Sequence, residues 1–135
     1  NEAQINVNYN KIEEMDNFAL EYTTKNQGKL YYDINVLAMF CVAIKRNVLD
    51  KVGYLDENYE VGMFEDDDYS FSLKKSGYIV ACAEDVFIHH FGSVSFKKLN
   101  DSNYRKIFEK NKKYYESKWN TVWVPHKYRD GVNLN

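Results

Sequence analysis

The nearly continuous apolar run INVLAMFCVAIKR, residues 34–46, limits the possible folds more than any other feature. A run of this length with no polar alternation is typical of a strand that is covered on both faces. Such a strand needs helices on both sides of its sheet, so the run predicts an α/β architecture. Cys41 lies in this run and Cys82 in a second apolar stretch, so both are expected to be buried free thiols.

The remaining segments predict an alternation of helices and strands. Helices are expected where apolar residues recur at helical spacing and glycines follow, and strands where short apolar stretches lie between turn residues. The predicted helices are 47–53, with Asn47 as N-cap, about 65–77 and about 101–119, and the predicted strands after the apolar run are 78–83 and 85–91. This order predicts helices packed on a sheet.

Length and charge limit the classes of partner. A chain of 135 residues is long enough for one domain, and a net charge of −2 gives no field that would attract nucleic acid. No apolar run reaches the roughly 18–20 residues of a membrane span, and no secretory signal is present, so a cytoplasmic protein is expected. The chain begins at Asn1 without Met, so we expect it to be a piece of a longer protein, and membrane association is expected only through that parent chain. Half of a domain would leave a sheet edge unpaired, and a homodimer is one way to cover that edge.

The stretch GMFEDDDYSFSLKKSGY, residues 62–78, places four acidic residues at the start of a predicted helix. Carboxylates in a first turn are favoured by the helix dipole, by about 0.3–1 kcal/mol each, so helix capping alone explains some of them. Met63 and Phe64 come directly before the cluster and are expected to anchor the turn in the core. Anchoring fixes a carboxylate in place, as a general base requires. A metal-binding regulatory domain is a weaker third interpretation, because the alternating ligands and glycine of an EF-hand are missing.

Two adjacent histidines, His89 and His90, end the last predicted strand. Neighbouring residues of a strand point to opposite faces, so at most one of them can face a given site. A structural role is the commoner one for a histidine in such a place. One imidazole with carboxylates falls short of a zinc site, but it suits a divalent cation that is held mainly by phosphates and carboxylates.

The stretch CVAIKRNVLDKVGYLDENYEVGMFEDDDYSFSLKKSGYIVACAEDVFIHHFGSVSF resembles the C-terminal half of the catalytic domain of family 2 glycosyltransferases, which have the GT-A fold. The tail FEKNKKYYESKW, followed by VPH, is similar to bacterial members. The matching positions are Arg46, Gly53, Asp56, Glu65, Asp66, Asp68, Gly77, His89, Gly92 and Ser93. The resemblance implies a mixed sheet with packed helices. It covers about residues 34–128 as the acceptor-side half, after a polar lead-in, 1–33, and before a tail, 129–135.

The resemblance also implies roles for individual residues. The chain would be part of an inverting, metal-dependent enzyme that moves a sugar from a nucleotide sugar, with a UDP-sugar expected first, to a hydroxyl of a glycan, a lipid-linked sugar or a protein. Asp66 would be the catalytic base, and Glu65 and Asp68 would shape the acceptor pocket. His89 would help to hold a divalent metal, Mn²⁺ or Mg²⁺, on the donor diphosphate.

Some features depart from the family pattern. Ser72 stands where many relatives have Arg, which removes a positive charge beside the acidic cluster, and Ala83 stands where many have Pro. The N-terminal nucleotide-binding half of the family, with its Asp-x-Asp metal motif, does not occur in these 135 residues. The chain alone is therefore expected to be inactive or nearly so. The alternative is a non-catalytic carbohydrate- or protein-binding module derived from the same fold.

Overall fold

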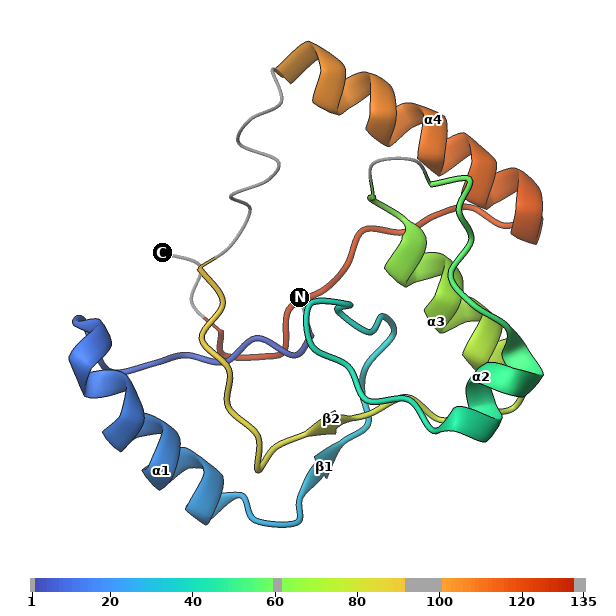
Figure 1. Cartoon of the computed structure of the whole chain (residues 1–135). Coiled ribbons are helices and arrows are strands. Elements are labelled where there is room, and N and C mark those ends of the chain that lie inside the picture. Colours follow the sequence, from blue (N-terminus) through green and yellow to red (C-terminus); the bar gives the residue numbers. More distant parts are fainter. Residues whose placement is uncertain (1, 60–61, 92–100, 133–135) are drawn as a thin grey trace.

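The computed structural model describes residues 2–59, 62–91 and 101–132, and every structural statement below concerns this part of the chain. Figure 1 shows α1 on one side of the molecule, α2, α3 and α4 on the other, and a small sheet between them at the lower end. The elements in chain order are the 3₁₀ helix η1 (Ile12–Glu14), α1 (Met15–Lys25), β1 (Leu30–Tyr31), α2 (Arg46–Val52), α3 (Glu65–Lys75), β2 (Cys82–Ala83) and α4 (Asp101–Trp119).

The three helices that the sequence predicts after residue 46 are confirmed. Helix α2 ends before Gly53, which takes a φ of 95°, and α3 is followed by Gly77 with a φ of 82°. Both values lie in the left-handed region that glycine adopts most easily at the end of a helix. The predicted cap of α2 is wrong, because the helix begins at Arg46 and Asn47 lies inside its first turn.

The predicted strand over 34–46 is wrong, because this segment bends and turns, pairs with no strand among the described residues, and already enters α2 at Arg46. Three of its backbone donors go instead to side chains. The carboxylate of Glu2 accepts from the N–H groups of Asn35 and Val36, at 2.7 and 3.1 Å, and the Ser70 hydroxyl accepts from Leu37 N–H at 2.9 Å. Buried N–H groups need a partner of some kind, and here side chains replace a strand.

The described sheet consists of two short antiparallel strands. Leu30 pairs with Ala83 and Tyr31 with Cys82, so of the predicted strand over 78–83 only the last two residues pair. The predicted strand over 85–91 is not formed, and His89 and His90 therefore lie on irregular backbone. The larger mixed sheet that the resemblance implies remains a prediction.

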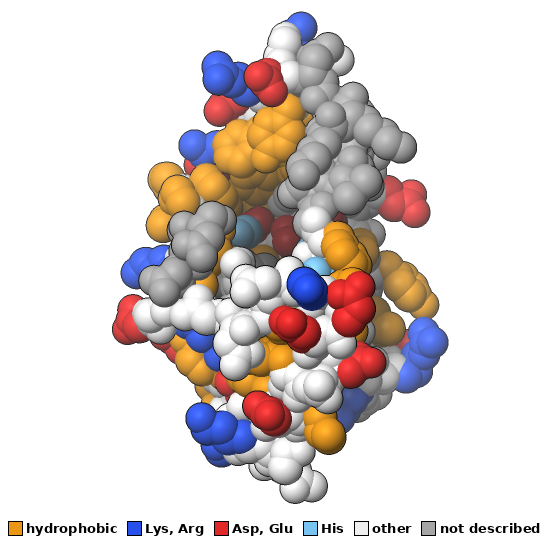
Figure 2. Space-filling view, turned by 90° about the vertical axis from the view of Figure 1, so that its left-hand side faces the viewer, with side chains coloured by type: hydrophobic (Ala, Val, Ile, Leu, Met, Phe, Trp, Pro, Cys, Tyr) orange, Lys and Arg blue, Asp and Glu red, His pale blue; other side chains and the backbone are white. Residues whose placement is uncertain are grey.

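Both cysteines are free, as predicted, but neither is fully buried: Cys41 is exposed and Cys82 is partly buried. A turn in which Cys41 N–H donates to the Ala38 carbonyl carries it to the surface. Other apolar side chains are exposed as well, among them Phe91 at 74% and Ile79 at 80%. Hydrophobic side chains accordingly show between the charged ones in the space-filling view (Figure 2).

Helix α3 lies between two clusters of buried side chains and contributes to both. The first cluster covers one side of α3 and consists of Ile34, Tyr69, Leu73 and Val80. The second joins α3 to α4 and consists of Tyr59, Phe64 and Tyr115, with both tryptophans packed against it. Because α3 packs against a cluster on each of two sides, the position of its first turn, where the acidic residues lie, is fixed.

A salt bridge ties the end of the chain to its beginning. The Arg129 guanidinium makes a two-pronged pair with Glu84, both bonds measuring 3.0 Å, and its Nε–H donates to the Glu2 carbonyl at 2.9 Å. The same guanidinium stacks over Tyr31, 4.0 Å from the ring centroid. Planar, bidentate contacts of this kind suit Arg and hold the C-terminal segment in place.

None of the described helices is both long enough and apolar enough to cross a membrane.

Candidate active site

A strained turn leads into α3. Gly62, Met63 and Phe64 have φ values of 95°, 68° and 77°, and for the latter two this left-handed conformation costs roughly 1–2 kcal/mol each. Phe64 is 3% exposed and packs against the rings of Phe108 and Trp123. Burial of this large side chain offsets the strain, so the expected anchoring of the acidic turn is present in the structure.

Asn111 of α4 holds the same turn from the other side. Its Nδ2 donates to the carbonyls of Gly62 and Met63, at 2.9 and 3.0 Å, and the residue is 2% exposed. The bonds join two segments that are 48 and 49 residues apart in sequence. The place of the acidic cluster therefore depends on α4 as well as on α3.

Replacing Asn111 with Ala is expected to lower the free energy of unfolding by about 2 kcal/mol, because two partly buried carbonyls lose their donor. Urea denaturation followed by circular dichroism measures this change. Lys113→Ala is the matched control on the same helix, since Lys113 is exposed and its replacement should change the stability by less than about 0.5 kcal/mol. Equal effects of the two substitutions would contradict the bracing role of Asn111.

Asp68 is braced by three donors. It is 4% exposed, and it accepts hydrogen bonds from Tyr59 Oη at 3.1 Å, Lys118 Nζ at 2.8 Å and Trp119 Nε1 at 2.7 Å. Its predicted contact with an acceptor remains a prediction. Because both of its oxygens already accept from the protein, the geometry favours a role in joining α3 to α4.

Lys118 extends this network to Asp56, another position of the family motif. Its Nζ lies 2.7 Å from Asp56 Oδ2, which also accepts from Tyr114 Oη at 2.8 Å. Burial alone raises the pKa of the Asp56 carboxyl, but hydrogen bonds from Lys118, Asn58 and Tyr114 outweigh burial and hold this pKa well below its ordinary value. Asp56 therefore stays ionised and keeps Lys118 in position.

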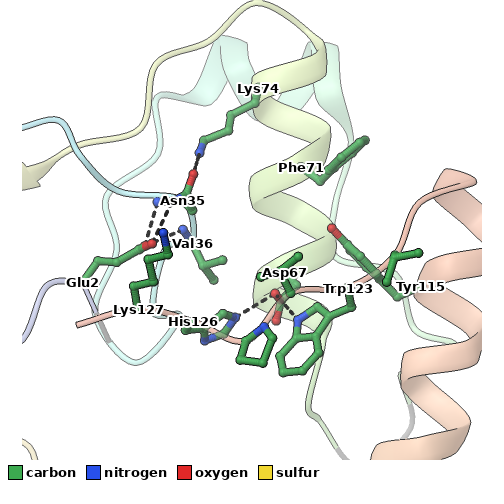
Figure 3. A pocket seen from close by; sticks show the side chains of 13 residues that line it. Glu2, Asn35, Val36, Asp67, Phe71, Lys74, Tyr115, Trp123, His126 and Lys127 are labelled. Atoms are coloured by element: carbon green, nitrogen blue, oxygen red, sulfur yellow. Dashed lines mark hydrogen bonds and ion pairs between the residues drawn. The ribbon is translucent and has the colours of Figure 1, made fainter. Parts of the chain in front are cut away.

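Asp67 is engaged by the C-terminal segment. It is 7% exposed, and its Oδ1 accepts from Trp123 Nε1 at 2.9 Å and lies 2.7 Å from His126 Nε2 (Figure 3). The hydrogen bond to Asp67 raises the pKa of the His126 imidazole, and burial opposes this rise without cancelling it. Asp67 and His126 thus form an ion pair over more of the pH range than a free imidazole would allow.

Asp66 differs from its two neighbours. In the described part of the chain its carboxylate accepts one hydrogen bond, from the N–H of Asp67 at 3.0 Å, and has no cation in direct contact. Burial, followed by the charges of Asp67 and Glu65, raises the pKa of Asp66 to about 6. One oxygen of Glu65, Oε2, is buried with no described hydrogen-bond partner. The pair Glu65 and Asp66 is therefore the part of the cluster that remains available for chemistry.

His89 lies away from these carboxylates. Its Nδ1 contacts the hydroxyl of Tyr9, and its ring packs against Phe91 with 4.5 Å between centroids. In Figure 1 the segment that precedes residue 92 and the start of α3 lie on different sides of the molecule, with the C-terminal segment between them. The described structure therefore does not bring together His89 and Asp66, the two residues to which the resemblance assigns metal binding and catalysis.

The fit of a divalent metal to His89 is partial. If the imidazole donates Nδ1–H to Tyr9, its Nε2 keeps a free lone pair, which is the arrangement that metal-binding histidines use. The described residues contain no group of three or more His, Cys, Asp or Glu that could surround a metal ion. Within the described residues, His89 would supply one ligand to such an ion. Gly92 and Ser93, the next two motif positions, lie outside the described residues.

The partners that hold Asp67 and Asp68 were not singled out from the sequence. They are Tyr59, which lies before the cluster, and Lys118, Trp119, Trp123 and His126, which lie after it. One signal was available, because an indole N–H is only a donor and needs an acceptor when it is buried. Two tryptophans and a histidine close together after a basic helix can supply three such donors to a surplus of carboxylates.

Comparisons of the chain with models of protein families, with curated proteins and with solved structures found no match.

Proposed function

We propose that this chain is the acceptor-side half of an inverting, metal-dependent glycosyltransferase, with Asp66 as its general base. The proposal assigns the chain to the family 2 glycosyltransferases and to a part of the GT-A fold. The donor would be a nucleotide sugar, with a UDP-sugar as the first candidate, and the acceptor a hydroxyl group of a glycan, a lipid-linked sugar or a protein.

The observation that carries the proposal is the state of Asp66 within the cluster. Asp67 and Asp68 are held by donors from the C-terminal third of the chain, whereas Asp66 is half-buried and has no cation in direct contact among the described residues. Capping of α3 would be served equally well by four solvated carboxylates. A desolvated carboxylate with a pKa of about 6 is instead suited to accept a proton at neutral pH.

The proposed reaction balances in one displacement. The acceptor oxygen forms a bond to the anomeric carbon while the bond from that carbon to the diphosphate breaks, and the proton of the acceptor hydroxyl passes to Asp66. The nucleoside diphosphate leaves with the electron pair of the broken bond. A divalent cation, when bound, stabilises the charge on this leaving group. Within this chain, His89 is the proposed ligand to that cation, through Nε2.

The test is the release of nucleoside diphosphate from a panel of nucleotide sugars with Mn²⁺. The assay uses the longest natural protein that contains this chain, because the 135 residues lack an Asp-x-Asp nucleotide-binding half and are expected to be inactive alone. Release that depends on an added hydroxyl acceptor is the expected result. Absence of release with every donor and acceptor tested would favour the alternative, a binding module without catalysis.

A further inference from the structure

A cavity of about 360 Å³ lies between α3, residues 35–36 and the C-terminal segment 122–127. Its volume is within the range of small-molecule sites, about 300–1,000 Å³. Figure 3 shows the side chains of Glu2, Lys74, Asp67, His126 and Lys127 around it. Asp66, the proposed base, is not part of its wall. The cavity is therefore a separate site beside the acidic turn.

The two carboxylates of the wall are already engaged. Glu2 is 5% exposed, and its oxygens accept from the backbone of Asn35 and Val36 and from Asn35 Nδ2 at 2.9 Å. Asp67 accepts from Trp123 and His126, at 2.9 and 2.7 Å. Both acids are thus partly compensated by donors within the protein, Asp67 through its Oδ1.

The positive charges of the wall are less fully compensated. Lys74 donates to the neutral amide oxygen of Asn35, at 3.1 Å, and neither Lys74 nor Lys127 forms an ion pair with another described residue. His126 uses Nε2 for Asp67, so when it is protonated its Nδ1–H is a further donor. Formal charges of three cations and two anions leave the wall positive by about one unit.

Most of the rest of the wall is apolar. Val36, Phe71, Val124 and Pro125 supply this surface, and together with the polar groups they give the mixed lining that is typical of pockets for small organic ligands. An apolar surface can pack against the C–H face of a sugar ring, whereas a free inorganic anion makes no favourable contact with such a surface.

We propose that this cavity binds the acidic group of a monosaccharide, a carboxylate or a phosphate, through His126, Lys74 and Lys127. The sugar part of this proposal rests on the proposed function, whereas the anionic part rests on the charges of the wall. Asp67 is then a positioning residue, because it holds the imidazole of His126 at the edge of the cavity.

The charge of His126 makes the affinity depend on pH. The charged groups that face it are Asp67 and Asp66 from α3 and Glu2 from the N-terminal segment, and together they raise the pKa of the imidazole. An imidazole with a raised pKa keeps its charge at pH 6 and loses it as the pH rises through that pKa. Affinity for an anion must therefore fall as the pH rises through the pKa of His126.

The experiment is an NMR titration of the chain with glucuronate, glucose 6-phosphate, glucose and inorganic phosphate, with the dissociation constants compared at pH 6 and, for glucuronate, also at pH 9. Binding of the two acidic sugars, at least tenfold tighter than glucose, is expected. Glucuronate binding should weaken severalfold at pH 9. If inorganic phosphate binds as tightly as glucose 6-phosphate, the sugar part is overturned.

Lysine substitutions are the variants of choice, because exposed lysines can be removed with little effect on folding. The double variant Lys74→Ala and Lys127→Ala is expected to weaken glucuronate binding about tenfold, since it removes two charged donors. The matched control, Lys106→Ala with Lys113→Ala on the exposed side of α4, should leave it unchanged. His126→Gln should remove the pH dependence.

Equal loss in both double variants, or binding of glucose as tight as that of glucuronate, would overturn the proposal. Absence of binding by either acidic sugar would do the same. Failure of the proposed function gives a different result, because acidic sugars would still bind here while the longer natural protein released no nucleoside diphosphate.

Discussion

Replacing Asp66 with Asn is expected to lower the rate of sugar transfer by about 10²- to 10⁴-fold, the usual contribution of a positioned general base. Asn has nearly the shape of Asp but accepts no proton at neutral pH. The change also removes one of several crowded negative charges, so the stability should stay the same or rise slightly. The release of nucleoside diphosphate by the longest natural protein that contains this chain, at saturating donor and acceptor, measures the rate.

Two comparisons make this result specific to Asp66. Asp50 of α2 is exposed, and Asp50→Asn should leave the rate within about twofold of the unchanged protein. Donor binding by the Asp66→Asn protein, measured by calorimetry, should be unaffected, because the proposed base contacts the acceptor. A rate that survives the Asp66 substitution would reduce the cluster to a helix cap.

Replacing Asp68 with Asn is expected to lower the free energy of unfolding by about 2 kcal/mol, because a buried carboxylate loses its charge-assisted hydrogen bonds. The Lys118 ammonium, 2.8 Å from Asp68, would lose one of its two carboxylate partners. Trp119 Nε1–H and Tyr59 Oη–H would have to share a weaker amide oxygen. Denaturation by urea measures this change, again with Asp50→Asn as the control.

The two substitutions are nearly isosteric and only two positions apart, so their contrast separates catalysis from folding. Asp66→Asn should affect transfer and spare stability, and Asp68→Asn should affect stability first. A loss of less than about 0.5 kcal/mol for Asp68→Asn would contradict the bracing of α3 by α4.

Helices were predictable from the sequence because their signals are local. Gly53 and Gly77 end α2 and α3 near the predicted positions, and the acidic turn begins α3 as expected. The strand predicted over 34–46 failed because pairing depends on what lies beside it. Glu2 and Ser70 supply the partners of its backbone instead, and no local pattern relates them to it.

The acidic site was predictable only where its signals are local. The apolar pair before the cluster indicated anchoring, and Phe64 is indeed buried at 3% exposure. The different environments of Asp66, Asp67 and Asp68 depend on donors 50 to 59 residues further along the chain, so a sequence pattern at the cluster could not separate them. The roles of Glu65 and His89 stay predictions of the family resemblance.

The most direct test of Asp66 as the base is the pH dependence of the single-turnover rate of transfer, measured for the unchanged protein and for Asp66→Asn. Asp66 must be ionised to accept a proton, and burial has raised its pKa to about 6. The rate of the unchanged protein should therefore rise with pH through about 6 and then level off. The Asp66→Asn protein should be slow and should lack this rise. An Asp66→Asn protein that keeps the same rise with pH would contradict the account.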